Sequence, residues 1–310
     1  MRVAVCDIGT NSTRLLVADV EDGHVREITR RTEITRLGEG VDRSGRLLDS
    51  AIERVLSVCA EYRQEIDRHA VERAVAVLTS AVRDAENGPQ LERALRERFG
   101  FDAQTISGDR EAQLTYIGAT SARSYDSPLL VLDIGGGSTE LVVGSGRSVA
   151  FHVSTQAGSV RHTERELTFD PPTDVELARC ADEIRTEIER AVPGEVRRSV
   201  VDGVAVAGTP TSLAAIELGL DPYDPERVDG HRLTRLSCQR MLEQLAALPL
   251  EQRRELRGLH PERAPTIVAG TIILIETMKA FALESMEVSE HDILHGAALE
   301  AAEADEHRPL

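Results

Sequence analysis

The chain carries the stretch Asp7-Ile8-Gly9-Thr10-Asn11-Ser12-Thr13-Arg14-Leu15-Leu16-Val17 and, at an offset of 126, the stretch Asp133-Ile134-Gly135-Gly136-Gly137-Ser138-Thr139-Glu140-Leu141-Val142-Val143. Seven of the eleven positions are identical. In each copy an apolar run enters an Asp-Ile-Gly turn and a second apolar run leaves it, which is typical of two strands joined by a glycine turn. Because this offset is longer than the period of solenoid repeats, the duplication predicts two similar domains, each opening with this hairpin.

The two glycine turns are suited to binding phosphate. Glycines can adopt φ > 0 and have no Cβ, so successive backbone N–H groups can converge on one phosphate oxygen, with Ser or Thr hydroxyls as further donors. An Asp at the head of each loop can hold a divalent metal that the same phosphate touches. The copies differ where Arg14 corresponds to Glu140. If only one copy were present, a tight turn that binds no ligand would be the favoured interpretation. Because the motif occurs twice, phosphate binding is favoured instead.

These tandem hairpins resemble the phosphate-1 and phosphate-2 loops of the actin, hexokinase and Hsp70 superfamily. The residues of the two motifs resemble those of the exopolyphosphatase and guanosine pentaphosphate phosphohydrolase (Ppx/GppA) family, and the resemblance extends from residue 3 to about 300. The resemblance implies an α/β protein of two ribonuclease-H-like domains with mixed sheets and an active site in the cleft between the hairpins. We expect the domains to span residues 1–125 and 126–310, with a C-terminal helix, about 292–305, packing back on the first.

The resemblance also implies which groups hold the phosphoryl group. Mg²⁺, for which other divalent ions could substitute, would be held by Asp7, Asp133 and Glu140. Phosphate would be bound by loop residues of three segments: Gly9, Thr10, Asn11 and Ser12; Gly135, Gly136, Gly137, Ser138 and Thr139; and Gly208 and Thr209.

Two strand-to-helix junctions supply the candidate catalytic residues. Arg83 follows Thr79-Ser80, where Ser80 can cap a helix and a guanidinium can grip phosphate bidentately. The segment is similar to the family's Thr-Ser-x-x-Arg stretch, whereas Arg83 on its own reads as an ordinary surface arginine. Glu111 would lie in the first turn of a helix, where it could serve as a helix cap or activate the attacking water. The family's Gly-x-Glu-Glu-Ala run reads Gly108-Asp109-Arg110-Glu111-Ala112 here. The resemblance therefore implies that Glu111 is the catalytic Glu, while Arg110 replaces the first glutamate, whose role stays open.

Other segments supply further candidates. The segment Gly208-Thr209-Pro210-Thr211 resembles the superfamily's third loop, and the hydroxyls of Thr209 and Thr211 could equally bind ligand or cap a helix. Arg161 and Arg263 match further arginine segments of the family. His291 and His295 have a spacing that can bind metal, but a polar helix face is favoured because the segment has no third ligand.

Composition excludes several classes of protein. The 310 residues include 36 Lys+Arg and 53 Asp+Glu, for a net charge of −17. Lys279, the only lysine, lies far from any glycine loop, which excludes a Walker-A site and a Schiff-base enzyme. So acidic a chain argues against binding duplex nucleic acid or anionic membrane. Residues 1–125 carry 18 Arg and 21 acids, so the excess acid belongs to the second half.

The four cysteines are scattered and the chain starts with a strand-like apolar run rather than a signal peptide, which predicts a cytoplasmic protein. No charge-free run reaches about 18 residues, so we expect no membrane span. A homodimer would be a common oligomeric state for such a protein. The expected activity is removal of the terminal phosphate from inorganic polyphosphate, gripped at its chain ends. A 5′-phosphohydrolase acting on guanosine pentaphosphate is the nearest alternative. An ATP-dependent kinase and a non-catalytic phosphate or nucleotide sensor are more distant alternatives to this function.

Overall fold

The computed structural model describes residues 1–121, 127–146 and 148–306. Contacts along the chain divide it into two compact units. Unit 1 consists of Met1–Arg123 and His291–Leu310, and unit 2 of Ser124–Glu290. The domain boundary expected near residue 125 falls in 122–126, outside the described residues.

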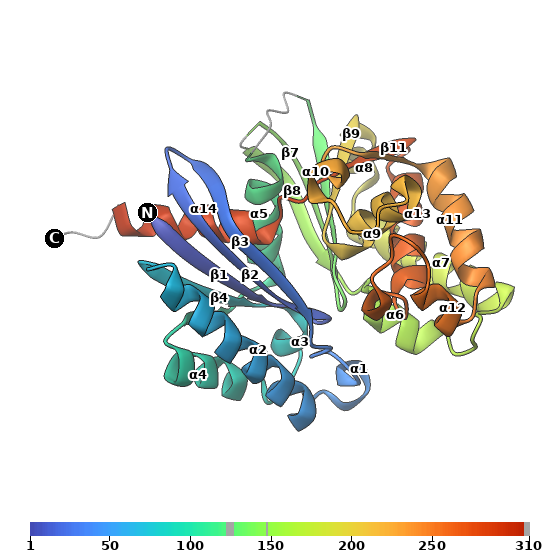
Figure 1. Ribbon diagram of the computed structural model, residues 1–310. Helices are drawn as coiled ribbons and strands as arrows, with labels where there is room; N and C mark the ends of the chain where they lie inside the picture. Colours follow the sequence, from blue (N-terminus) through green and yellow to red (C-terminus); the bar gives the residue numbers. More distant parts are fainter. Residues whose placement is uncertain (122–126, 147, 307–310) are drawn as a thin grey trace. The chain divides into compact units, whose positions relative to one another are not determined.

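Unit 1 is built on a five-stranded mixed sheet (Figure 1). Its strand order is β3-β2-β1-β4-β5. The first three strands pair antiparallel, and β1, β4 and β5 pair parallel. The strands are β1 (Arg2–Ile8), β2 (Ser12–Glu21), β3 (His24–Ile34), β4 (Arg73–Leu78) and β5 (Asp102–Thr105).

Helices cover both faces of this sheet, because its central strand is apolar on both sides. Ala4, Cys6 and Ile8 pack on the side of α2 and α4, whereas Val3 and Val5 pack on the side of α5 and α14 (Figure 1). Successive strand residues point to opposite faces, so one strand supplies both cores. The helices of unit 1 are α1 (Val41–Ser44), α2 (Asp49–Arg68), α3 (Ser80–Arg83), α4 (Gly88–Phe99), α5 (Gly108–Thr120) and α14 (Ile293–Glu306).

The C-terminal helix α14 crosses α5 at close range through two glycines. A Cβ on Gly118 would lie 1.8 Å from the carbonyl oxygen of Asp292, and one on Gly296 would lie 1.9 Å from that of Leu114. Both neighbours are backbone atoms, so neither glycine can carry a side chain without moving a helix. The crossing therefore fixes the start of α14 relative to α5.

Unit 2 repeats the topology of unit 1. Its six-stranded sheet has the order β10-β11-β9-β6-β7-β8, in which β8-β7-β6-β9-β11 corresponds to β3-β2-β1-β4-β5. The predicted α/β class with mixed sheets in both halves is confirmed, and β10 is an addition at the edge. The strands are β6 (Leu129–Ile134), β7 (Thr139–Ser145), β8 (Ser148–Thr155), β9 (Asp202–Val206), β10 (Arg232–Thr234) and β11 (Ser285–Val288).

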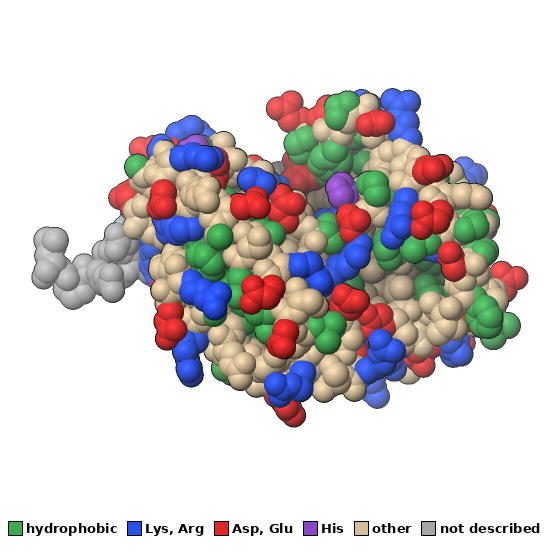
Figure 2. All heavy atoms as spheres, turned by 60° about the horizontal axis from the view of Figure 1, so that its bottom comes forward, with side chains coloured by type: hydrophobic (Ala, Val, Ile, Leu, Met, Phe, Trp, Pro, Cys, Tyr) green, Lys and Arg blue, Asp and Glu red, His purple; other side chains and the backbone are tan. Residues whose placement is uncertain are grey.

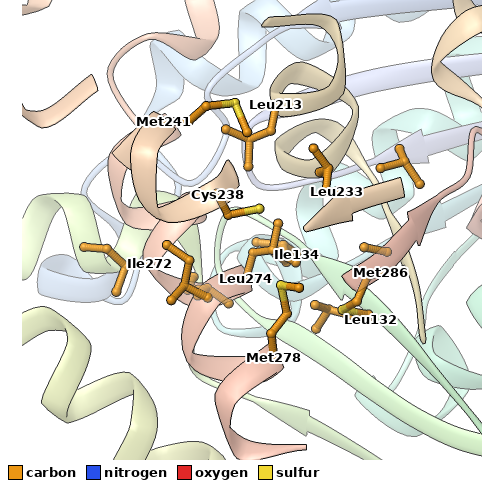
Figure 3. Packing of buried hydrophobic residues seen from close by; sticks show 14 of the residues in the cluster. Leu132, Ile134, Leu213, Leu233, Cys238, Met241, Ile272, Leu274, Met278 and Met286 are labelled. Atoms are coloured by element: carbon orange, nitrogen blue, oxygen red, sulfur yellow. The ribbon is translucent and has the colours of Figure 1, made fainter. Parts of the chain in front are cut away.

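One aliphatic core holds unit 2 together. Leu132 and Ile134 of β6 pack with Leu213, Ile272 and Met278 from the covering helices (Figure 3). No described helix is long and apolar enough to cross a membrane. The helices of unit 2 are α6 (Ser159–Glu166), α7 (Asp174–Ala191), α8 (Gly194–Ser199), α9 (Gly208–Leu218), α10 (Pro225–Val228), α11 (Arg235–Ala247), α12 (Leu250–Arg254), the 3₁₀ turn η1 (Pro261–Arg263) and α13 (Ile267–Ala280).

Candidate active site

In unit 1, three parallel strands end side by side at one edge of the sheet. Ile8 is paired with Leu78, and Leu78 with Thr105, at the carboxyl ends of β1, β4 and β5. The next residues continue this alignment, since the Thr79 N–H donates to the Ile8 carbonyl (3.2 Å) and the Ile106 N–H to that of Leu78 (3.0 Å). The carboxyl edge of parallel strands is where α/β sheets bind ligands. The first glycine loop, the turn before Arg83 and the start of α5 therefore share one edge.

The first glycine loop is fixed through its carbonyl groups. The Gly9 N–H donates to the Ser12 carbonyl (3.0 Å) and so closes the turn. The Thr10 carbonyl accepts from the Gly38 N–H (2.8 Å), and the Asn11 carbonyl accepts from two amides of the 35–36 segment. Within the described part of the chain, the N–H groups of Thr10 and Asn11 donate to no protein acceptor. These two amides, rather than that of Gly9, are the donors this loop can offer to an anion.

The segment 35–38 that supports the loop was missed in the sequence. A Cβ on Gly38 would lie 2.1 Å from the Thr10 Cγ2, so the segment needs a glycine where it crosses the loop. The sequence pattern that could have revealed this segment is the glycine-rich run Leu37-Gly38-Glu39-Gly40 after a strand. Glycines in such a place are typical of a site where another stretch of backbone comes close.

Asp7 lies at the end of β1 and is buried. Its partner across the hairpin is Arg14, whose Nε and Nη2 donate to the same oxygen, Oδ2, at 2.8 and 2.7 Å. Oδ1 is buried and has no hydrogen-bond partner among the described residues. Burial raises the pKa of Asp7, and the Arg14 guanidinium offsets this only in part. A buried carboxylate oxygen without a partner is a suitable place for a cation or its bound water.

The two candidate catalytic residues of unit 1 meet. The Arg83 Nη1 donates to the Glu111 Oε2 at 2.9 Å and to the Ile106 carbonyl at 3.1 Å. Glu111 is buried in the first turn of α5, whose cap is the Ser107 hydroxyl. Glu111 is therefore held by Arg83 and is not needed as the cap.

The structure also gives the partners of Ser80 and Arg110. Ser80 does not cap a helix, because the backbone cap of α3 is Thr79 and the Ser80 hydroxyl pairs with that of Thr10 at 2.8 Å. This bond ties the first glycine loop to the turn that carries Arg83. Arg110, which replaces the family's first glutamate, forms an ion pair with Glu300 of α14.

In unit 2 the second glycine loop is fixed in the same way. The Gly135 N–H donates to the Ser138 carbonyl (3.0 Å), and the carbonyls of Gly135 and Gly136 accept from the first amides of α6 at 2.8–3.1 Å. Within the described residues, the N–H groups of Gly136, Gly137 and Ser138 donate to no protein acceptor. The loop therefore presents three amides, as a phosphate-binding turn would.

Arg161 and Gly158 shape this loop. The Arg161 Nε donates to the Gly137 carbonyl at 2.8 Å, so this side chain supports the loop. A Cβ on Gly158 would lie 2.3 Å from the Gly136 oxygen and 2.4 Å from the Gly137 carbonyl carbon. Thr139, at the end of the loop, is buried, and its hydroxyl donates to the Ala157 carbonyl.

Two carboxylates face each other across the second hairpin. Asp133 and Glu140 are directly opposite in register, as Asp7 and Arg14 are in unit 1, and both are buried. Ser154 donates to the Glu140 Oε1 at 2.7 Å. Side chains opposite each other on neighbouring strands are close enough to interact, so two acids here favour a cation. Among the described residues, no group of three or more His, Cys, Asp or Glu side chains is placed to hold a metal ion.

The third loop begins α9 beside the second. Val206, at the end of β9, is paired with Asp133, so Gly208 and the 135–138 loop leave the same edge. The Arg263 guanidinium covers Gly208, where a Cβ would lie 1.5 Å from Nη1. Thr209 is buried against Gly270 of α13, whereas the Thr211 hydroxyl donates to the Ala207 carbonyl at 3.0 Å within the helix. Arg263 is thus at the loop edge of unit 2.

Ala207 is strained at this turn, with φ 70° and ψ −171°. That region is essentially restricted to glycine, and it costs other residues about 1–3 kcal/mol. We expect Ala207→Gly to raise the free energy of unfolding by about 1 kcal/mol, after the larger chain entropy of glycine is subtracted. Thermal unfolding checks this, with Ala205→Gly in the regular part of β9 as the control that should destabilise. A loss of stability in Ala207→Gly would contradict the assignment of strain.

The residues present fit a divalent cation. Asp7 has a buried oxygen without a protein partner, and Asp133 and Glu140 form an opposed pair of acids. Oxygen ligands of this kind suit Mg²⁺, which is usually bound by one or two carboxylates together with substrate phosphates. The expected shared cleft and the joint action of all three acids stay predictions.

Comparison with known proteins identifies the family. The Ppx/GppA phosphatase family model matches residues 16–304. "Exopolyphosphatase 2" of Mycobacterium tuberculosis is 37% identical over 318 residues, covering 97% of this chain and 98% of that protein. The crystal structure of an exopolyphosphatase-like protein has a TM-score of 0.92 at 32% identity, covering 98% of this chain and 99% of that one. The Ppx/GppA family member of Aquifex aeolicus has a TM-score of 0.84 at 33% identity, covering 99% of both chains. The chain therefore belongs to the Ppx/GppA phosphatase family, whose members have the actin-like fold, and is a phosphoanhydride hydrolase.

Proposed function

We propose that the protein is an exopolyphosphatase that removes the terminal phosphate of inorganic polyphosphate by using a water activated by Glu111. The observation that carries this proposal is the Glu111–Arg83 pair at 2.9 Å, on the sheet edge that also presents the amides of Thr10 and Asn11. A carboxylate that accepts a proton from water and donors that receive a phosphoryl group are the two parts that such a hydrolysis needs. The relation to "Exopolyphosphatase 2" supports the choice of substrate.

Each residue has a proposed part. Glu111 orients the attacking water and accepts its proton. Arg83 holds the Glu111 carboxylate and offers its remaining N–H groups to the phosphoryl oxygens. The amides of both glycine loops bind those oxygens as charge moves to the leaving group, at no cost of reorganisation. Thr10 and Ser80 keep the first loop in place through their hydroxyl pair.

Mg²⁺ would be held by Asp7, Asp133 and Glu140, and when bound it would offset the charge of the terminal phosphates. Arg14 is bonded to Asp7, so it orients this carboxylate rather than serving as a separate phosphate ligand.

The distribution of charged side chains on the surface supports a substrate that is bound at its chain end. On the face seen in Figure 2, basic and acidic side chains are interspersed, and neither sign forms a continuous stripe. Many of the arginines are paired with acids, as Arg31 is with Glu33 and Arg46 is with Glu86. A long polyanion is held along its length by a basic track, whereas a chain end needs only local donors.

The proposal is tested by measuring phosphate release from pure protein with Mg²⁺, in parallel on polyphosphate and on guanosine pentaphosphate. We expect a higher kcat/KM on polyphosphate, and chelation of the metal should abolish release. A higher kcat/KM on guanosine pentaphosphate would assign the same residues to the 5′-phosphohydrolase reaction. Ligand binding without release on either substrate would identify a sensor and overturn the proposal.

A further inference from the structure

Asp292 is a buried acid that the proposed reaction does not use. It lies immediately before α14 in unit 1 and is 1% exposed. Its Oδ1 accepts from the Leu294 N–H at 3.0 Å, which caps the start of the helix. Capping of the helix accounts for the role of Oδ1 but gives no role to Oδ2.

The second oxygen faces the arginine of the first hairpin. The Arg14 Nη1 donates to the Asp292 Oδ2, while Nε and Nη2 of the same guanidinium donate to the Asp7 Oδ2. Arg30 of β3 also donates to the Asp292 Oδ2, at 3.3 Å. Two carboxylates and two guanidinium groups therefore form one network, in which Arg14 links Asp292 to Asp7.

The arrangement has a consequence for Asp7. A guanidinium beside a single carboxylate tends to bind both of its oxygens as a fork. Here Nη1 donates to Asp292, and the two other nitrogens of the guanidinium, Nε and Nη2, both donate to one oxygen of Asp7. The Asp7 Oδ1 is left without a protein partner among the described residues. Without Asp292, Arg14 would be free to turn onto that oxygen.

Asp292 itself is held in place from several sides. The Asp292 N–H donates to the His295 Nδ1 at 3.4 Å, and the His295 Nε2 is 3.0 Å from the Glu27 Oε1. The crossing of α5 and α14 brings the Asp292 backbone against Gly118. His295 is buried in this network, so the expected polar helix face is wrong for it. Because α5 also carries Glu111, one helix crossing fixes both the proposed base and Asp292.

We propose that Asp292 is a positioning residue, which holds Arg14 so that Oδ1 of Asp7 stays available to a divalent cation. This inference rests on the proposed function only in taking Asp7 as a metal ligand. Residues that orient metal ligands commonly contribute a factor of 10–100 to metal affinity. Asp292 would act in this way through Arg14, without touching the cation or the substrate.

The test measures binding of Mn²⁺ alone, by calorimetric titration of the full chain without substrate. Asp292→Asn keeps the cap, because Asn is as good an N-cap as Asp, and it removes the charge that holds Arg14. We expect its Kd for Mn²⁺ to rise about tenfold or more. Asp19→Asn, which breaks an Asp–Arg pair at the other end of the same hairpin, should leave the Kd unchanged.

A double-mutant cycle separates positioning from a merely structural role. If Asp292 acts through Arg14, Asp292→Asn should change the Kd less than about twofold in an Arg14→Met background. An unchanged Kd in the single variant, an equal loss in both backgrounds, or a native chain that binds no Mn²⁺ would each overturn the inference. Asp292→Ser, which also caps, takes the place of Asp292→Asn if that variant does not fold. Native protein that binds Mn²⁺ in the expected pattern but releases no phosphate would refute the proposed function and leave this inference standing.

Discussion

Glu111→Gln is expected to lower kcat for phosphate release by about 10²–10⁴-fold while KM and thermal unfolding change little. Glutamine keeps the shape of the side chain and can still accept from Arg83, but it cannot take a proton from water. The loss corresponds to about 3–5 kcal/mol of transition-state stabilisation. A fall in kcat at constant KM indicates an interaction made only in the transition state. Steady-state kinetics on polyphosphate with saturating Mg²⁺ measure it.

Asp109→Asn is the matched control for this substitution. Asp109 is an exposed acid in the same first turn of α5, so its loss tests whether negative charge at this helix terminus is enough. We expect its kcat to stay within about twofold of the native value, since the charge of an exposed side chain is screened by solvent and salt. Native turnover in Glu111→Gln, and equally in Glu111→Ala, would remove this residue from the mechanism.

The second large effect is expected from Gly158→Ala, which should lower kcat/KM by about 100-fold or more. The added methyl group would meet the backbone of Gly136 and Gly137 at 2.3–2.4 Å, so the loop must shift. Gly158 has φ −115°, which any residue can adopt, so the effect is steric and not conformational. A displacement of about 1 Å in a group that binds the reacting centre can cost about 100-fold. Overpacking of this kind also destabilises, by about 1–3 kcal/mol.

Gly194→Ala provides the comparison, because its new methyl group would meet only the flexible ends of arginine side chains at 3.1 Å and beyond. Kinetics and thermal unfolding on both variants separate a displaced loop from a general loss of stability. A comparable loss of turnover in Gly158→Ala and Glu111→Gln would support the use of both units in one reaction. Near-native kinetics in Gly158→Ala would show that the second loop does not bind the reacting phosphate.

Local pattern was sufficient to predict the two hairpins. Each apolar run, glycine turn and second apolar run became a strand, a turn and a strand, because alternation and turn chemistry act over a few residues. The duplication predicted a common topology, and both sheets share their strand order. The first-turn position of Glu111 followed from the Ser107-Gly108 junction in the same way.

Hydrogen-bond partners could not be predicted in this way. The amides of Gly9 and Gly135 close their own turns, so the available donors are their successors in each loop. Ser80 looked like a helix cap by residue type, yet its hydroxyl pairs with Thr10, which is 70 residues away. Residue type states what a group can donate or accept, whereas the alignment of strand ends determines which acceptor is near.

By itself, the sequence determined two glycine hairpins on two duplicated mixed sheets, each with a carboxylate at the head of its loop. Only the tertiary structure decided what those side chains meet. Arg14 is bonded to Asp292, 278 residues later in the chain, because α14 crosses α5 at two glycines and brings the residue that caps α14 to the first hairpin. Patterns of hydrophobicity and turn residues encode local conformation, but a contact between distant charges depends on how helices pack on the sheet.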